Sequence, residues 1–135
     1  MSESAAITDA QRLAAEWACA KLIALYANLN DEARWDEVAA LYTAGGLMTR
    51  PTAPDAPIIG REAILAAFKG RPPRKTRHVC SNVVITIEGP TSASGVSAMV
   101  LFSETGAPLA GSFHDRFELT ADGWRFAERR GTLAW

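Results

Sequence analysis

Two histidines and a few acidic residues are the side chains of this sequence best suited to proton transfer near neutral pH. The chain contains only His78 and His114, and imidazole, with an unperturbed pKa of about 6.5, changes its charge near pH 7. Asp31 directly follows a long apolar segment. It is expected either to cap a helix or to orient a histidine and raise its basicity. We favour Asp31 and His78 as the pair that carries chemistry.

Side-chain alternation along an expected strand favours His78 over His114. Because successive residues point to opposite faces, His78, Cys80 and Asn82 share one face of the strand expected at residues 78–87. Such a mixed polar row is unusual for a hydrophobic core and natural for the wall of a pocket. The pattern predicts that Asn82 faces the same side as His78.

A second alternating segment, residues 111–119, places a carboxylate among large apolar side chains. Phe113 and Asp115 lie in the row that is expected to face inward. Burial of a lone charge is costly. Asp115 is therefore expected either to act in a site or to form a structural ion pair with an arginine such as Arg125 or Arg129.

The remaining charged residues favour solvated surface over a site. His114 and Arg116 belong to the polar row of their strand, which fits a solvated face or a subunit interface. The basic stretch 71–77 surrounds two prolines, and such a run is more typical of a solvated loop than of an anion site. With a formal net charge of −1, the chain lacks the basic face of nucleic-acid binders.

The sequence contains no pattern for a metal site or a disulfide framework. Cys19 and Cys80 are too few and too widely spaced, and the two histidines lack the spacing of a ligand cluster. There is no glycine-rich phosphate loop or serine nucleophile elbow. No uncharged apolar run reaches about 18 residues and no leader pattern opens the chain, so no membrane span is expected and the cytoplasm is the default location.

Helical periodicity is confined to the first half of the chain. Residues 8–30 begin with a capping box and predict one long helix. A second helix is expected over 34–42, ended by the glycine pair at 45–46, and a third over 62–68, with a proline-rich loop at 51–57. The stripe of the first helix that is expected to face the core comprises Leu13, Trp17, Leu22, Leu25, Tyr26 and Leu29.

From residue 76 onward, β-branched and aromatic residues broken by turn signals predict strands. We expect four antiparallel neighbours, at 78–87, 93–103, 111–120 and 124–133. Helices followed by strands predict an α+β domain in which helices cover one face of a bent antiparallel sheet. All 135 residues are expected to form one such domain.

Several motifs extend over nearly the whole chain. They are Tyr26 with Asp31 and Trp35, Leu41-Tyr42, Ile59 to Ile64, Arg77-His78 with Asn82, Gly111 to Phe117, Gly123 to Arg125, Glu128 to Arg130, and Trp135. Their identity and order resemble the SnoaL-like branch of the nuclear transport factor 2-like superfamily, which also includes scytalone dehydratase, ketosteroid isomerase and the small subunits of ring-hydroxylating dioxygenases.

This resemblance implies a cone-shaped, cystatin-like roll in which a long helix and a curved sheet enclose a hydrophobic pocket, without a cofactor. In dehydratase-like members an aspartate at the helix junction pairs with a histidine on the first long strand, and a tyrosine projects into the cavity. The matching residues here are Asp31, His78 and Tyr26. The residues expected to contact a small-molecule ligand are Asn82, Asp115, Trp35 and Phe113. A homodimer, or a trimer, packed through the sheet face is also implied.

The chain departs from the family pattern at two places. The acidic pair often found after the second helix is replaced by glycines at 45–46, and Phe113 stands where a tyrosine often precedes the Asp-Arg motif. Both changes remove a polar group, which implies a more apolar pocket or a loss of the chemistry.

Together these patterns predict a cofactor-independent lyase or isomerase that acts on a small, mostly apolar, cyclic or carbonyl-containing molecule. His78, oriented by Asp31, would take or relay a proton, and Tyr26 and Asn82 would bind an oxygen on which charge develops. The alternative is a non-catalytic ligand-binding or assembly module, because one scaffold hosts many functions. A dioxygenase small subunit is a third possibility, which the short N-terminal segment does not favour.

Overall fold

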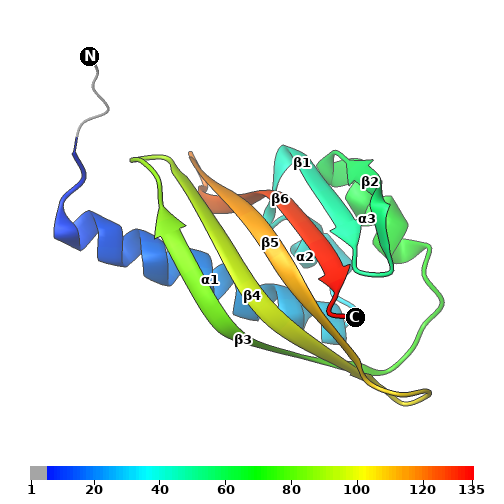
Figure 1. The fold of residues 1–135 in the computed structure, drawn as a ribbon. Coiled ribbons are helices and arrows are strands. Elements are labelled where there is room, and N and C mark those ends of the chain that lie inside the picture. Colours follow the sequence, from blue (N-terminus) through cyan, green and yellow to red (C-terminus); the bar gives the residue numbers. More distant parts are fainter. Residues whose placement is uncertain (1–5) are drawn as a thin grey trace.

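The computed structural model describes residues 6–135, which form three helices and one six-stranded sheet (Figure 1). In chain order the elements are α1 (Asp9–Asp31), α2 (Trp35–Ala39), β1 (Tyr42–Arg50), β2 (Ala53–Ile59), α3 (Arg61–Lys69), β3 (Thr76–Ile87), β4 (Ser92–Ser103), β5 (Leu109–Thr120) and β6 (Gly123–Leu133). The predicted α+β class, with the helices preceding the long strands, is confirmed. No helix of this described part combines the length and hydropathy needed to cross a bilayer.

The sheet has the strand order β2-β1-β6-β5-β4-β3. The four predicted strands of the second half form antiparallel neighbours from β3 to β6. An entirely antiparallel sheet is not what forms, because β1 joins β6 in parallel. The sheet bends, with α1 across one face of its long strands and α3 beside β1 and β2 (Figure 1). This curvature leaves room for side chains to converge between α1 and the sheet.

Two expectations for the segment between residues 34 and 59 were wrong. The helix predicted over 34–42 is limited to α2, and the glycine pair at 45–46 lies inside β1 rather than ending a helix. Most of the loop predicted at 51–57 is β2, which pairs antiparallel with β1. Pairing on both sides of β1 outweighs the weak strand propensity of glycine, and proline is tolerated in β2 because it is an edge strand.

Helix α1 starts with the predicted capping box, but its buried stripe is shifted from the predicted one. Leu13 and Trp17 are both 65% exposed. The stripe begins instead at Ala15 and Cys19, small residues that allow a close approach to the neighbouring strand β3. The buried residues of α1 are Ala15, Cys19, Leu22, Ile23, Tyr26, Ala27 and Asn30.

A β-bulge interrupts the alternation of β3. The pairing register with β4 shifts between Ser81 and Val84, and Asn82 has a φ of +53°, a conformation that asparagine tolerates better than most residues. His78 is half-buried before the bulge, whereas Ile85 is half-buried after it, so the inward-facing parity changes. Asn82 is consequently exposed. The prediction that it shares the face of His78 was wrong. A bulge inserts one residue, and a one-residue slip moves later side chains to the other face.

The outer face of the sheet carries both apolar and polar side chains. Val84 and Val96 are 58% and 44% exposed. Val96 is the cross-strand partner of both Val84 and His114. His114 and Arg116 are exposed on this face, as their polar row indicated. A homodimer or trimer through this face stays a prediction.

The backbone of β6 passes close to the turn that follows β1. A Cβ atom at Gly131 would lie 2.7 Å from ring carbons of Pro51. We expect Gly131→Ala to lower the free energy of unfolding by about 1–3 kcal/mol, because overpacking forces the backbone apart. Urea denaturation measures this difference, and Gly45→Ala is the matched control, because nothing lies within 4 Å of its added Cβ. Equal free energies for the two variants would contradict the prediction.

Candidate active site

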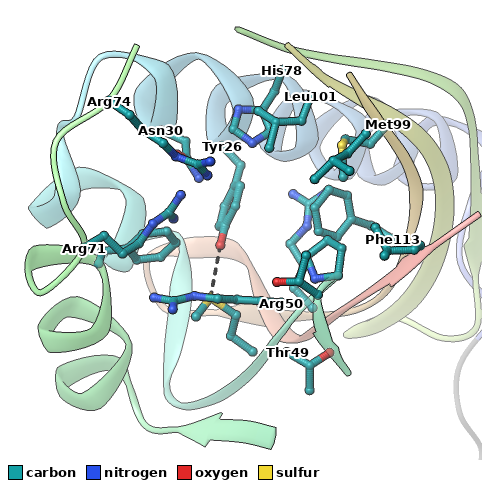
Figure 2. Close-up of a pocket in the computed structure, with 17 residues that line it drawn as sticks. Tyr26, Asn30, Thr49, Arg50, Arg71, Arg74, His78, Met99, Leu101 and Phe113 are labelled. Atoms are coloured by element: carbon teal, nitrogen blue, oxygen red, sulfur yellow. Dashed lines mark hydrogen bonds between the residues drawn. The ribbon is translucent and has the colours of Figure 1, made fainter. Parts of the chain in front are cut away.

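A cavity of about 230 Å³ lies between the curved sheet, α1 and α3 (Figure 2). The apolar part of its wall includes Met48, Phe68, Met99, Leu101, Leu109, Phe113 and Leu133. Its polar and charged lining includes Tyr26, Asn30, Arg50, Arg71, Arg74, His78 and Arg129. Helices α1 and α3 and strands β1, β3, β4, β5 and β6 contribute to the lining, so the cavity depends on the packing of most of the elements.

The structure brings Asp31 and His78 together. Asp31 is the last residue of α1, and its Oδ1 atom lies 2.6 Å from His78 Nδ1. Asp31 Oδ2 accepts the backbone N–H of His78 at 2.8 Å, and the Thr76 hydroxyl donates to Oδ1 at 2.9 Å. The Asp31 and His78 side chains are only 10% and 11% exposed. Three hydrogen bonds therefore fix the carboxylate, and the carboxylate fixes the imidazole.

This geometry determines which nitrogen of His78 is available for chemistry. An ionised carboxylate only accepts hydrogen bonds, so Nδ1 carries the proton and Nε2 keeps its lone pair. Burial lowers the pKa of His78 below 6.5, against the opposing effect of Asp31. The positive charges of Arg71 and Arg129 lower this pKa further. His78, which lines the cavity, is thus a neutral base at pH 7.

Tyr26 also lines the cavity, as expected, and is held by polar contacts from β1. Its hydroxyl oxygen lies 2.9 Å from that of Tyr42. The same hydroxyl lies 3.5 Å from the sulfur of Met48, a contact drawn as the dashed line in Figure 2. Burial raises the pKa of Tyr26 above 10.0. Tyr26 consequently remains a neutral phenol that can donate a hydrogen bond.

Asp115 forms an ion pair with Arg129, one of the two arginines considered for it. The residues are cross-strand partners on β5 and β6, and Asp115 Oδ1 lies 3.4 Å from Arg129 Nε. Both side chains are buried, and burial raises the pKa of Asp115 to about 6 despite Arg129. It is Arg129, not Asp115, that lines the cavity. Sequence reasoning considered Arg129 only as a partner for Asp115 and missed its place in the cavity wall.

Besides its ion pair with Asp115, the Arg129 guanidinium lies against aromatic faces. Its central carbon lies 3.8 Å from the ring centroid of Phe113 and 4.5 Å from that of Tyr26, which are cation–π distances. Its three nitrogens are buried and have no hydrogen-bond partner among residues 6–135. Buried donors of this kind normally have partners, so an acceptor supplied by a ligand would complete the site.

The other three residues that were predicted to contact a ligand lie in three different places. Phe113 lines the cavity as expected. Trp35 does not; it stacks on Phe68 at 5.2 Å and borders an adjoining cavity of about 220 Å³ that also contacts Arg71 and Arg74. Asn82 is exposed at the β3 bulge and lies outside both linings. Within residues 6–135, no cluster of His, Cys, Asp or Glu is arranged to hold a metal ion.

Comparisons with known proteins agree with this architecture. A family model described as a SnoaL-like domain matches residues 11–130. No curated protein matches the chain.

Solved structures with similar folds include three from Novosphingobium. A proposed scytalone dehydratase from Novosphingobium aromaticivorans is 21% identical, with a TM-score of 0.84 over 95% of this chain and 89% of that one. An NTF2-like protein with a cystatin-like fold from the same species is 23% identical, with a TM-score of 0.81 over 92% and 84%. The hexachlorocyclohexane dehydrochlorinase LinA-type3 from Novosphingobium barchaimii is 15% identical, with a TM-score of 0.84 over 95% and 92%. These similarities confirm the predicted cystatin-like fold.

The protonation of His78 tests the site directly. We expect an NMR titration to give a pKa below 6.5 for His78, and a still lower pKa in Asp31→Asn, because that substitution removes the charge and the hydrogen bond that favour imidazolium. The folded chain should lose stability as pH falls from about 6.5 to this lowered pKa, since the unfolded chain binds the proton more readily. His114→Gln assigns the two histidine signals. A higher pKa in Asp31→Asn would refute this account.

Proposed function

The chain belongs to the SnoaL-like domain family, and from this premise we propose that it is a cofactor-independent lyase or isomerase that moves protons on a small cyclic, carbonyl-containing molecule. The observation that carries the proposal is the 2.6 Å contact between Asp31 and His78 at the wall of the cavity. A carboxylate that orients a neutral imidazole is the arrangement that a general base requires. The proposal concerns reaction type and not one named substrate.

In the proposed reaction, His78 Nε2 removes a proton from the carbon next to the substrate carbonyl. The electrons of the broken C–H bond move toward the carbonyl oxygen and form an enolate, while Asp31 stabilises the resulting imidazolium. In an elimination, the enolate electrons then form the C=C bond as a hydroxyl group leaves, and the imidazolium returns its proton so that water departs. In an isomerisation, the same proton returns to a different carbon.

In this proposal, Tyr26 and Arg129, which both line the cavity, would stabilise the enolate oxygen. Tyr26 offers a neutral hydroxyl, and the Arg129 guanidinium lies 4.5 Å from the Tyr26 ring with nitrogens that lack partners among the described residues. Donors and fixed charge in a water-poor site stabilise developing negative charge more strongly than they would in water. Asp115 has the separate role of compensating the charge of Arg129.

The names of the structural relatives agree with this chemistry. A dehydratase and a dehydrochlorinase both couple removal of a proton to loss of a leaving group. At 21% and 15% identity these relatives support the proposal only through a shared fold. The Asp31 and His78 geometry of this chain is the independent support.

Loss of activity in dyad variants tests the proposal. For 3-hydroxycyclohexanone and related probes, we expect His78→Gln and Asp31→Asn to lower kcat by about 10²–10⁴-fold, because each removes general-base catalysis. The dehydration product is followed by enone absorbance, and proton removal by deuterium incorporation from D₂O in NMR spectra. The pH profile of kcat/KM should rise with pH and level off near neutrality, because only neutral His78 accepts a proton.

His114→Gln is the matched control, because His114 is exposed on the outer face of the sheet. It should retain the parent activity. If dyad variants exchange and eliminate as fast as the parent, the proposal is wrong. If the parent binds probes but catalyses neither exchange nor elimination, the chain is a binding module.

A further inference from the structure

We propose that the natural ligand of this cavity carries a carboxylate, which Arg71 and Arg74 bind while the apolar wall holds the rest of a small cyclic molecule. This inference rests on the proposed function for the role of His78, and it adds the substrate class. The juxtaposition that carries it is a set of arginines at one side of a mainly apolar cavity.

The charges that line the cavity are all of one sign. Arg50, Arg71, Arg74 and Arg129 contribute to its wall, and no aspartate or glutamate of the described chain does. Among residues 6–135, only Arg129 of these four forms an ion pair. The other three guanidinium groups therefore face the cavity without a carboxylate partner from this part of the chain.

Arg50 also has a guanidinium nitrogen that lacks a hydrogen-bond acceptor among the described residues. One of its terminal nitrogens donates to the backbone oxygen of Ala67 at 3.0 Å. Its Nε atom is buried and has no hydrogen-bond partner within the described chain. Together with the buried nitrogens of Arg129, this leaves donors around the cavity that an anionic ligand would satisfy.

The sequence explains why Arg71 and Arg74 reach the same cavity. Pro72 and Pro73 fix φ near −65°, and a residue before proline is restricted to extended conformations. An extended proline segment has about three residues per turn, which places side chains i and i+3 on the same side. Both arginines line the main and the adjoining cavity, whereas Lys75 of the same segment lines neither. The solvated-loop interpretation of this stretch therefore does not hold for Arg71, which is half-buried, whereas Arg74 is exposed and lines the cavity as well.

Two aromatic rings lie against the guanidinium of Arg71 and help to position it. The guanidinium carbon of Arg71 lies 5.4 Å from the ring centroid of Phe68 and 5.8 Å from that of Trp35. Burial lowers the pKa of Arg71, and the nearby charges of Arg74 and Arg50 lower it further, because each repels the Arg71 guanidinium. An anion between them would convert this repulsion into attraction.

The remainder of the cavity limits what the anion can be attached to. Figure 2 shows Arg71 and Arg74 across the cavity from Met99 and Phe113. A volume of about 230 Å³ is small for a ligand pocket. A planar carboxylate suits the two-pronged guanidinium geometry, and an apolar ring suits the opposite wall. Small cyclic carboxylic acids combine both features.

Equilibrium binding tests the inference without any turnover. Isothermal titration calorimetry should show that cyclohexanecarboxylate binds the parent at least about tenfold more tightly than cyclohexanecarboxamide, because charge-assisted hydrogen bonds are stronger than neutral ones. The double variant Arg71→Gln/Arg74→Gln should lose this preference. Lys75→Gln, which removes one positive charge from the same segment, should keep it. Added salt should weaken the carboxylate more than the amide.

The inference is overturned if the carboxylate and the amide bind equally, or if Lys75→Gln weakens binding as much as the double variant does. It is also overturned if inorganic phosphate alone binds as tightly as cyclohexanecarboxylate, because the apolar wall would then contribute nothing. His78→Gln should retain the preference for the carboxylate, since binding does not need the base. A carboxylate preference without turnover therefore refutes only the proposed function, whereas turnover of neutral ketones without that preference refutes only this inference.

Discussion

The hydrogen bonds between Asp31 and His78 join the end of the long helix to the sheet at the wall of the cavity. Asp31 ends α1, and His78 lies near the start of β3. The carboxylate accepts both the side chain and the backbone N–H of His78, so it fixes the imidazole and the strand beneath it with one group. The geometry of the proposed catalytic pair is therefore set by the same contact that links the long helix to β3, an edge strand of the sheet.

The buried ion pair between Asp115 and Arg129 keeps a cation beside the cavity. Asp115 and Arg129 are almost completely removed from solvent, and their contact at 3.4 Å leaves both carboxylate oxygens and all three guanidinium nitrogens without a hydrogen-bond partner among the described residues. Replacement of such a pair by apolar residues is often neutral or stabilising in other proteins. Stability alone does not account for a pair in this position. Its placement against Phe113 and Tyr26 suits an electrostatic role in the cavity.

Local patterns in the sequence were sufficient for α1, α3 and the long strands, because periodicity and helix-end chemistry act over a few residues. The juxtaposition of Asp31 and His78, which lie 47 positions apart, was implied by the family resemblance. Local patterns were insufficient where long-range pairing decides the outcome. β1 forms despite its glycines because β2 and β6 flank it. Asn82 left the predicted face because a bulge changed the strand parity, and no local signal in a pattern of alternating residues reports a bulge.

Local sequence patterns were also insufficient for Arg71 and Arg74, because a charged loop and a charged cavity wall have the same composition. The fold decides between them, because it places Arg71 and Arg74, which follow α3, in the wall of the cavity. The consequence for His78 is specific. Burial, joined by the positive charges of Arg71 and Arg129, lowers the pKa of His78, while Asp31 orients the imidazole and opposes this effect. The charges that would attract an anionic ligand therefore also favour the neutral form of His78 on which the proposed chemistry depends.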